Sequence, residues 1–416
     1  MKRFLRFFLY LAGGIALIGG LSGCVTTPTP SIPPTTPEAP PTQPTPAPPP
    51  LRYQPVAWSA LPGWSQDTLA DAWPAWQMSC RALLKRESER VVWTAPCQAA
   101  ETVDPNRPDA IRAFFETHFQ AWQILADNVD GTTTDRGLIT GYYEPLLAGS
   151  HTQDTRYRYP LYPRPDDLLT VELASLYPEL EGKRVRGRLV GNKVLPYFSR
   201  AEIDRGNPAL KATPLFYVDD AMDAFFLHIQ GSGRLQLPDG RVVRLGYADQ
   251  NGHPYRAIGG VLMQRGDIAR ENLSMQTIKA WGRANPNALP ALLDENPSYV
   301  FFREVPPPEP GTLDARIDGP IGALGVPLLA QRTIAIDRTL LPLGAPFFLD
   351  AIDPDSRAPI QRLTMAQDTG GAIRGAIRAD FFCGTGKDAG ERAGKMRETG
   401  RLWLLWPKGQ EPEGRT

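Results

Sequence analysis

The C-terminal part of the chain, from about residue 334 onward, consists of short apolar runs separated by glycine and proline. The runs at 334–336 and 403–406 are typical of this pattern. A helix of ordinary length would need apolar residues repeated every three or four positions over ten or more residues, whereas short strands fit runs of this length. The sequence therefore favours a mainly β unit at this end of the chain.

Three separate aspartates lie among these runs. Asp337 directly follows the run at 334–336, Asp368 opens the segment DTGGAIRG, and Asp380 precedes two phenylalanines and a Gly-Thr-Gly segment. Isolated acids on short strands of a Gly-rich β unit can line a groove with carboxylates, which is the equipment that cleavage of a glycosidic bond uses. All three aspartates are therefore candidate site residues.

The N-terminal residues are typical of an export signal. Basic residues at positions 2, 3 and 6 precede an apolar stretch at 7–20, which is too short to span a bilayer comfortably. The sequence LSGC that follows, ending at Cys24, resembles the lipobox of bacterial lipoproteins, in which the cysteine is lipidated and becomes the mature N-terminus. Val25 stands where inner-membrane lipoproteins commonly have Asp, so the resemblance implies an outer-membrane lipoprotein that faces the periplasm. The alternative is an ordinary signal peptide with a chance cysteine.

Residues 25–50 contain almost only proline, threonine, alanine and serine. Such a segment cannot form a core, and its prolines hold the backbone extended. At about 3.1 Å per residue, a polyproline stretch of this length reaches roughly 80 Å. We therefore expect a signal peptide at 1–23 and a lipidated cysteine with a semi-rigid tether at 24–50.

Composition and motifs exclude several classes of function. Lys and Arg together number 45, as do Asp and Glu, so the formal net charge is zero and nothing indicates a nucleic-acid partner. The four histidines lack metal-ligand spacing, and neither a Gly-x-Ser-x-Gly motif nor a complete dinucleotide fingerprint is present. The sequence therefore predicts no metal and no cofactor. Cys80 and Cys97 could pair in an oxidising periplasm, and Cys383 is then expected to be a buried small hydrophobe.

The region after the tether is long enough for two domains. Apolar periodicity predicts helices at 66–86 and 108–127, and a strand at 137–145 ends at a proline. The segment 146–305 differs, because its short runs are separated by proline and glycine and read as strands; these runs are 159–162, 185–188, 224–230 and 241–245, with helices expected near 270–284 and 287–294.

A proline-rich connector at 304–310 follows the middle segment. The middle segment is thus bounded by a proline on one side and by this connector on the other, which suggests an insertion. We expect residues 51–145 and 306–416 to form one discontinuous barrel domain and residues 146–305 to form a second, β-rich lobe. The cleft between them is the default substrate site.

Several motifs in the same order resemble those of a known family. The stretch with the three aspartates resembles the 3D domain, and its combination with four further motifs resembles the membrane-bound lytic murein transglycosylase A family over roughly residues 110–408. These motifs are GYYEP at 141–145, FLHIQGSG at 226–233, GYAD at 246–249 and ENPSYVFF at 295–302.

The resemblance implies a mainly β fold with flanking helices, in which a double-psi β-barrel carries the aspartates and a smaller β domain is inserted. It implies cleavage of peptidoglycan strands between N-acetylmuramic acid and N-acetylglucosamine, with a 1,6-anhydro product and no water consumed. The catalytic acid of the family maps onto Asp380. The groove residues implied are Tyr142, Tyr143, Gln230, Gly231 and Ser232. Other cell-wall enzymes remain open as partners.

The chemistry of the residues leaves alternatives open for the supporting positions. Asp368 could supply a second negative charge that raises the pKa of the acid, but its Thr-Gly-Gly neighbours equally suit a structural turn. Asp337 could line the site or be structural. Strand alternation would place one of Tyr142 and Tyr143 outward and the other in the core. The segment that begins at Gln230 could offer an amide to N-acetyl groups or be a Gly-rich hairpin loop.

Two competing functions remain at this stage. An ordinary hydrolase on a similar barrel would need a second carboxylate to activate water, and Asp368 is the candidate. A lipoprotein without enzymatic activity could bind the cell wall or scaffold other enzymes. The products formed from peptidoglycan separate these possibilities.

Overall fold

The computed structural model describes residues 51–413, except 129, 178–179 and 181–184. The predicted signal peptide, lipobox cysteine and tether lie outside the described residues. Within the described ranges, no helix is both long and apolar enough to cross a membrane.

The larger sheet contains a closed ring of strands. The ring runs β18–β15–β16–β14–β17–β4 and closes because β4 also pairs with β18. The pairs β14–β16 and β17–β4 are parallel and the other pairs of the ring are antiparallel. The ring strands are β4 (Gly137–Glu144), β14 (Thr333–Ile336), β15 (Pro346–Ile352), β16 (Pro359–Asp368), β17 (Ala379–Thr385) and β18 (Arg397–Pro407). Closure leaves the ring without free edges, and it fits the barrel that the family resemblance implied.

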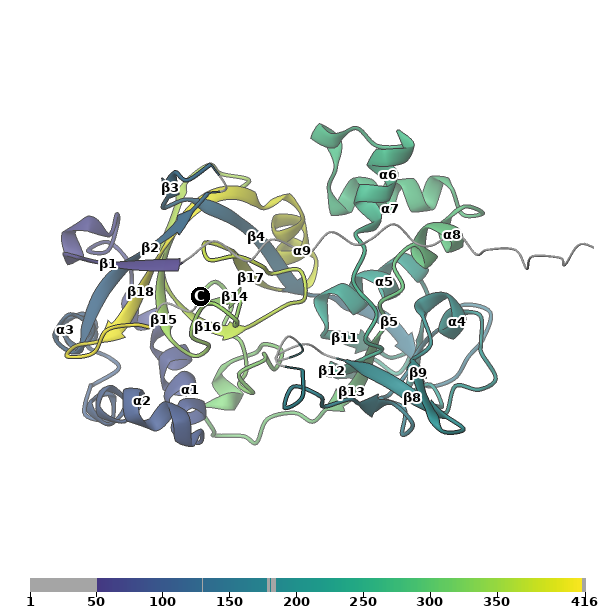
Figure 1. Ribbon diagram of the computed structural model, residues 1–416, viewed down its shortest axis with the longest axis horizontal. Coiled ribbons are helices and arrows are strands. Elements are labelled where there is room, and N and C mark those ends of the chain that lie inside the picture. The colour runs from purple at the N-terminus through teal and green to yellow at the C-terminus, as the bar shows by residue number, and fades with distance from the viewer. Residues whose placement is uncertain (1–50, 129, 178–179, 181–184, 414–416) are drawn as a thin grey trace, which may run out of the picture. The chain divides into compact units, whose positions relative to one another are not determined.

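Three more strands extend the sheet beyond the ring: β2 lies beside β18, and β1 and β3 pair with β2 (Figure 1). They are β1 (Leu51–Val56), β2 (Phe119–Asp127) and β3 (Thr133–Thr134). The barrel and the strands that extend it are therefore built from both ends of the described chain, with β1 to β4 contributed before the middle segment and β14 to β18 after it.

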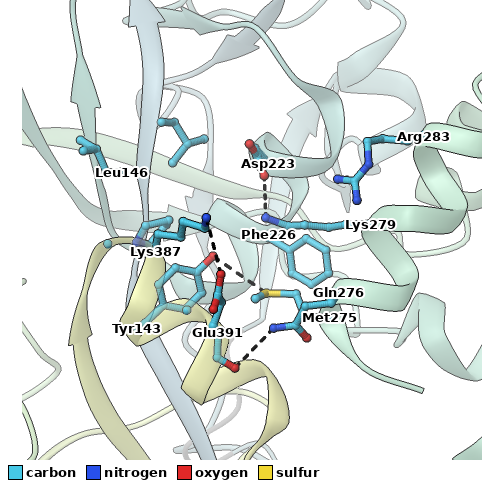
Figure 2. A pocket seen from close by; sticks show the side chains of 14 residues that line it. Tyr143, Leu146, Asp223, Phe226, Met275, Gln276, Lys279, Arg283, Lys387 and Glu391 are labelled. Carbon is cyan, nitrogen blue, oxygen red and sulfur yellow. Dashed lines mark hydrogen bonds and ion pairs between the residues drawn. The ribbon is translucent and has the colours of Figure 1, made fainter. Parts of the chain in front are cut away.

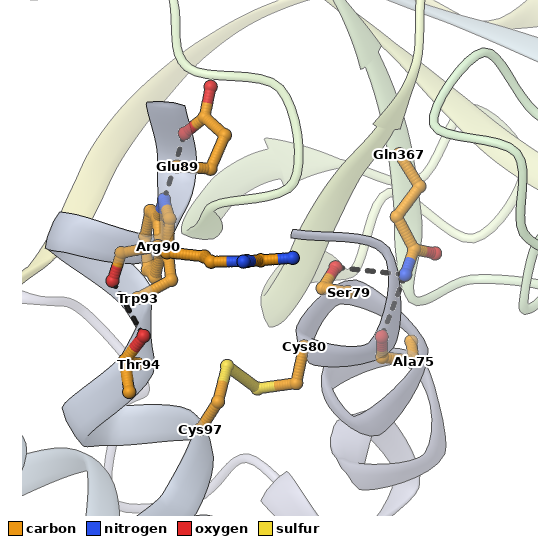
Figure 3. Close-up of a disulfide and its surroundings, with 9 residues drawn as sticks. All are labelled: Ala75, Ser79, Cys80, Glu89, Arg90, Trp93, Thr94, Cys97 and Gln367. Atoms are coloured by element: carbon orange, nitrogen blue, oxygen red, sulfur yellow. Dashed lines mark hydrogen bonds between the residues drawn. A yellow bond between two sulfur atoms is a disulfide. The ribbon is translucent and has the colours of Figure 1, made fainter. Parts of the chain in front are cut away.

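Three helices cover one side of the barrel: α1 (Trp73–Leu83), α2 (Glu87–Ala100) and α3 (Pro108–His118). They bury Trp73, Trp76 and Trp93 in the same core as the strands. A disulfide between Cys80 and Cys97 joins α1 to α2, so the pairing that the sequence left open is present (Figure 3). The free thiol of Cys383 is buried, as expected.

The expected helix at 108–127 is wrong in its second half. Helix α3 ends at His118, and the chain continues as strand β2, which pairs with β1 and β18. Phe119, Trp122 and Leu125 fit a helical period, but pairing with two neighbouring strands satisfies this backbone and decides its conformation. The helix expected at 66–86 is a 3₁₀ turn at Leu69–Ala72 followed by α1, and α2 was not predicted.

The middle segment forms two further sheets. A six-stranded sheet has the order β13–β12–β11–β5–β10–β6, and a three-stranded sheet has the order β7–β8–β9. The strands are β5 (Leu146–Ser150), β6 (Tyr159–Leu161), β7 (Leu169–Thr170), β8 (Arg186–Val190), β9 (Lys193–Pro196), β10 (Phe216–Val218), β11 (Gly233–Gln236), β12 (Val242–Gln250) and β13 (Val300–Val305). This confirms a mainly β fold with helices.

Helices of the middle segment are α4 (Arg200–Asp204), α5 (Ala221–Gln230), α6 (Ile258–Arg265), α7 (Met275–Ala284) and α8 (Leu289–Asp294). The strand expected at 224–230 is wrong, because these residues belong to α5. Asp220 caps this helix by accepting a hydrogen bond from the backbone N–H of Asp223, and Gly231 ends it in the left-handed conformation with φ 76°. Such caps stabilise a helix even where its sequence is an apolar run.

A buried ion pair joins the barrel to the middle segment. Glu144 of β4 accepts hydrogen bonds from Arg234 of β11 and from Thr385 of β17, both at 2.9 Å. Arg234 also pairs with Asp318 at 2.6 Å. Because Glu144 is only 1% exposed, these contacts fix the point where the chain passes from β4 into the middle segment.

Candidate active site

Two of the three predicted aspartates lie in one row across the barrel wall. Ala335 of β14 is paired with Asp368 of β16 on one side and with Asp380 of β17 on the other, and Asp380 is paired with Thr140 of β4. Adjacent strands lie about 4.8 Å apart, so the Cα atoms of the two aspartates are separated by roughly 10 Å. The register thus brings together two acids that are far from Thr140 in the sequence.

Asp380 sits in a poorly hydrated part of this row. Burial raises the pKa of its carboxyl above the ordinary value, whereas a hydrogen bond from the hydroxyl of Thr140 and the charge of Arg378 oppose the rise. The two phenylalanines that follow Asp380, Phe381 and Phe382, are fully buried. A carboxyl in such an environment favours its protonated form more than an exposed one does.

Asp368 is held by backbone groups at the edge of a cavity. Its Oδ1 accepts hydrogen bonds from the N–H groups of Ala323 at 3.0 Å and Thr369 at 2.9 Å. Burial raises the pKa of Asp368 to about 6, and the charge of Asp380 adds to the rise. Asp368 therefore forms a structural turn and also lines the cavity, although the sequence had left these two possibilities as alternatives.

The residue before Asp368 anchors this strand to the helical layer. Gln367 is buried, and its Nε2 donates hydrogen bonds to the carbonyl of Ala75 at 2.7 Å and to Ser79 Oγ at 3.0 Å, both on α1 (Figure 3). The pairing of β14 with β16 shifts register at Ile334 and Ala335. The end of β16 is therefore fixed from two sides.

Asp337 lies apart from the cavity. It is 3% exposed and accepts hydrogen bonds from the Thr339 hydroxyl at 2.7 Å, from Arg374 at 3.2 Å and from the Gly375 N–H at 3.0 Å. These contacts hold the turn after β14 against the loop that follows Asp368. In the structure Asp337 positions that loop and does not line the cavity.

The two tyrosines point to opposite faces of β4, but both are buried. Tyr142 packs against Phe382, with ring centroids 5.2 Å apart, in a cluster that includes Leu328 and Ile373. The predicted alternation is present, and the outward-facing Tyr142 is buried because the segment that carries Leu328 and the loop that carries Ile373 cover the outer face of the barrel at this point.

The hydroxyl of Tyr142 lies close enough to both acids for their charges to shift its pKa. Burial, followed by the charges of Asp368 and Asp380, raises the pKa of this phenol well above its usual range. Among the residues that the structure describes, the hydroxyl makes no hydrogen bond of ordinary geometry. Tyr142 therefore presents a neutral donor near the two carboxyls.

A cavity of about 480 Å³ separates the barrel from the middle segment beside Asp368. Gln230, Gly231 and Ser232 line it from the end of α5, and Asp368 lines it from the barrel. Further lining residues include Tyr247, Gln250, Tyr255 and Arg303 from the middle segment and Thr369, Gly370 and Arg338 from the barrel. Three of the five groove residues implied from the sequence thus share one cavity with Asp368, whereas Tyr142 and Tyr143 do not line it.

Gln230 also connects Tyr143 to this cavity. Its Oε1 accepts a hydrogen bond from the backbone N–H of Tyr143 at 3.1 Å. Tyr143 itself lines a second cavity of about 380 Å³ between α5, α7 and α9 (Gly386–Lys395), which Figure 2 shows. In that cavity Lys279 pairs with Asp223 at 2.6 Å.

Thr140, Arg303 and Arg338 were not predicted as site residues. Thr140 could have been found, because it lies two positions before Tyr142 on a predicted strand and so shares its face. The two arginines carry no sequence signal that distinguishes them from other surface arginines. In the described part of the chain, no group of three or more His, Cys, Asp or Glu side chains could hold a metal ion.

The chain matches two protein-family models, the MltA specific insert domain over residues 138–303 and the 3D domain over residues 332–406. It is 35% identical over 294 residues to the membrane-bound lytic murein transglycosylase A of Escherichia coli strain K12, and the alignment covers 68% of this chain and 68% of that protein. This chain belongs to the membrane-bound lytic murein transglycosylase A family. The resemblance stated from the sequence is confirmed.

Solved structures of this family are similar throughout the described region. The monoclinic form of MltA from Neisseria gonorrhoeae is 38% identical with a TM-score of 0.74, covering 88% of this chain and 95% of that chain. MltA from E. coli with bound chitohexaose is 28% identical with a TM-score of 0.59, covering 87% of this chain and 95% of that chain.

Proposed function

We propose that this protein is a lytic transglycosylase that cleaves peptidoglycan strands between N-acetylmuramic acid and N-acetylglucosamine. It forms 1,6-anhydro-muramic acid ends and consumes no water. The observation that carries this proposal is the environment of Asp380, a carboxyl with a pKa raised by burial in the same strand row as the cavity-lining Asp368. Its relatives are named for this activity.

One carboxyl can complete the reaction in two proton transfers. Protonated Asp380 donates its proton to the glycosidic oxygen, so that the bond between this oxygen and C1 of the muramic sugar breaks. The C6 hydroxyl of the same sugar then attacks C1, and ionised Asp380 takes the proton of that hydroxyl. The acid is regenerated in its protonated form, which is the form that burial favours.

The neighbouring groups have supporting roles in this proposal. Asp368, held by two backbone N–H groups, stabilises the positive charge that develops on the sugar ring. Tyr142 keeps a neutral hydroxyl beside the two acids. Asp337 holds the loop after Asp368 through Gly375 and Arg374.

The groove residues bind the glycan. The Oε1 of Gln230 is occupied by the N–H of Tyr143, which leaves its amide NH₂ group for a carbonyl of the substrate such as that of an N-acetyl group. Gly231 and Ser232 allow close approach of the backbone. The E. coli relative whose structure contains chitohexaose supports a chain of N-acetylated sugars as the ligand.

The proposal also covers location and domain boundaries. Cys24 is lipidated and anchors the protein in the outer membrane, facing the periplasm, which agrees with the membrane-bound relatives. Residues 51–145 and 306–416 form the barrel domain, and residues 146–305 form the inserted domain. Mass spectrometry of the peptide that contains position 24, from the wild type and from Cys24→Ser, would reveal the lipid or its absence.

The activity is tested with soluble protein comprising residues 51–416 and its Asp380→Asn form. Each is incubated with purified peptidoglycan, and the released fragments are analysed by mass spectrometry. Anhydro-muropeptides from the wild type alone support the proposal. Fragments with reducing ends would identify a hydrolase and give Asp368 the role of base, whereas binding without any fragments would favour a wall-binding lipoprotein.

A further inference from the structure

Two arginines line the cavity without a partner among the residues that the structure describes. Arg303 comes from β13 of the middle segment and Arg338 comes from the turn after β14 of the barrel. Both side chains are exposed, and neither has an ion pair or hydrogen bond with another side chain of the described residues. The cavity therefore receives free positive charge from both of its walls.

The strand pairing explains why Arg303 is free. Its cross-strand partner on β12 is Gly246, which has no side chain that could neutralise or cover a guanidinium. Opposite charges on paired strands can form a cross-strand ion pair, and no such pair can form here because Gly246 has no side chain. The guanidinium of Arg303 is left to the solvent and to whatever enters the cavity.

A different arrangement leaves Arg338 free. The carboxylate next to it in the chain, Asp337, is already bound by Arg374, by the Thr339 hydroxyl and by the N–H of Gly375. The carboxylate in the cavity, Asp368, is bound by the backbone N–H groups at its own edge. Neither acid therefore pairs with Arg338.

The glycan backbone of peptidoglycan is neutral, because N-acetylated sugars joined by glycosidic bonds carry no ionised group. Its acids are the carboxylates of the peptide stem that is attached to the lactyl group of muramic acid. A planar guanidinium with several fixed donors matches a carboxylate better than it matches a sugar hydroxyl. Two free guanidiniums on facing walls thus suit a strand that carries its stem.

We propose that Arg303 and Arg338 bind the stem carboxylates, so that the enzyme selects glycan strands whose peptide stems carry ionised carboxylates over strands whose stems are uncharged. This rests on the proposed function. It assigns to the middle segment, through Arg303, and to the barrel, through Arg338, a shared role in substrate selection. The pair recognises the acidic peptide, and the groove around Gln230 recognises the sugars.

The test compares two forms of one substrate. Soluble strands are used as isolated, or after their stem carboxylates have been converted to neutral amides, which keeps the peptide and removes its negative charge. The purified full-length chain, Arg303→Gln, Arg338→Gln and the double variant are assayed for kcat/KM on both forms. The readout is the ratio of the two values, which does not change when a variant merely loses folded protein.

We expect the wild type to prefer the charged strands. Each single substitution should lower that preference about fivefold and the double substitution by roughly twentyfold, because an accessible charge pair contributes up to about 1 kcal/mol. Added salt should weaken the preference of the wild type. Arg270→Gln is the matched control, since Arg270 is also exposed and lies outside both cavities.

Three results would overturn the proposal. The first is equal cleavage of both forms by the wild type. The second is a loss by the variants of the same factor on both forms, which would assign the arginines to the glycan or to folding. If the wild type cleaves neither form, the proposed function itself fails. The Asp380→Asn protein then separates the two ideas, since equal retention of charged and amidated strands in a pull-down also rejects stem binding.

Discussion

The hydroxyl of Thr140 should set the pH dependence of the reaction. It donates a hydrogen bond to Asp380 across the β17–β4 pair, and a donor stabilises the ionised carboxylate more than the protonated acid. Thr140→Val keeps the shape of the side chain and removes the donor. The pKa of Asp380, already raised by burial, should therefore rise further.

The size of the shift follows from the strength of such a bond. A hydrogen bond to a charged group contributes about 1.5–3 kcal/mol, and one pKa unit corresponds to about 1.4 kcal/mol. Part of the bond persists to the protonated acid, so we expect a shift of about one unit. Because the acid must be protonated at the start of the reaction, kcat/KM falls as the pH rises through this pKa, and the falling limb should move upward by about one pH unit.

The assay is the initial rate of muropeptide release from peptidoglycan between pH 4 and pH 9, for wild type, Thr140→Val and Thr94→Val. Thr94 is a matched control, because its hydroxyl is bonded at 2.7 Å to the carbonyl of Arg90 on α2, away from the site. A falling limb that stays in place, or moves to lower pH, would refute either the coupling of Thr140 to Asp380 or the role of Asp380 as the titrating acid.

Three further outcomes follow from the contacts of the site. Burial raises the pKa of Asp368 to about 6. The contribution of this carboxyl to the free energy of unfolding is therefore fully present below the unfolded pKa of about 4 and is lost as the pH rises through 6. Asp368→Asn should thus raise the free energy of unfolding by roughly 3 kcal/mol at pH 7.5 and little at pH 4, measured by urea denaturation. Cys97→Ala opens the loop closed at Cys80, 17 positions away, and should lower that free energy by about 3 kcal/mol, with reductant giving a similar loss in the wild type. Asp337→Ala removes the acceptor of several hydrogen bonds and should cost about 2–3 kcal/mol and lower kcat, whereas Asp337→Asn, which keeps an acceptor, should lose less in the same assays.

Short-range patterns predicted the strands of the barrel well. The runs around Ile334 and Trp403 became β14 and β18, and the segment that ends at Glu144 became β4. These strands are buried on at least one face, and their apolar runs are too short for a helix. The patterns failed at β2, because the spacing of Phe119 and Trp122 fits a helix as well as the strand that forms.

Local propensity also could not identify α5 or α9. The run at 224–230 is rich in aromatic and branched residues, so it resembles a strand, and only its caps at Asp220 and Gly231 mark a helix. Helix α9 consists largely of glycine and charged residues and shows few apolar positions, yet Gly390 lets it approach the ring of Tyr143, where an added Cβ would lie 2.7 Å away. Both helices are fixed by packing partners that are distant in the sequence.

The candidate site depends on register, which the sequence leaves open. The family resemblance indicated Asp380, but the row from Asp368 through Ala335 and Asp380 to Thr140 exists only because β14 pairs in parallel with β16 and β17 pairs in parallel with β4. Two acids near each other oppose folding, since the charge of Asp380 disfavours the ionised form of Asp368. A closed ring, whose wall cannot slip or open at an edge, holds them there. Both acids belong to the barrel, while the middle segment, joined through the ion pair of Glu144 and Arg234, supplies the other wall of the cavity.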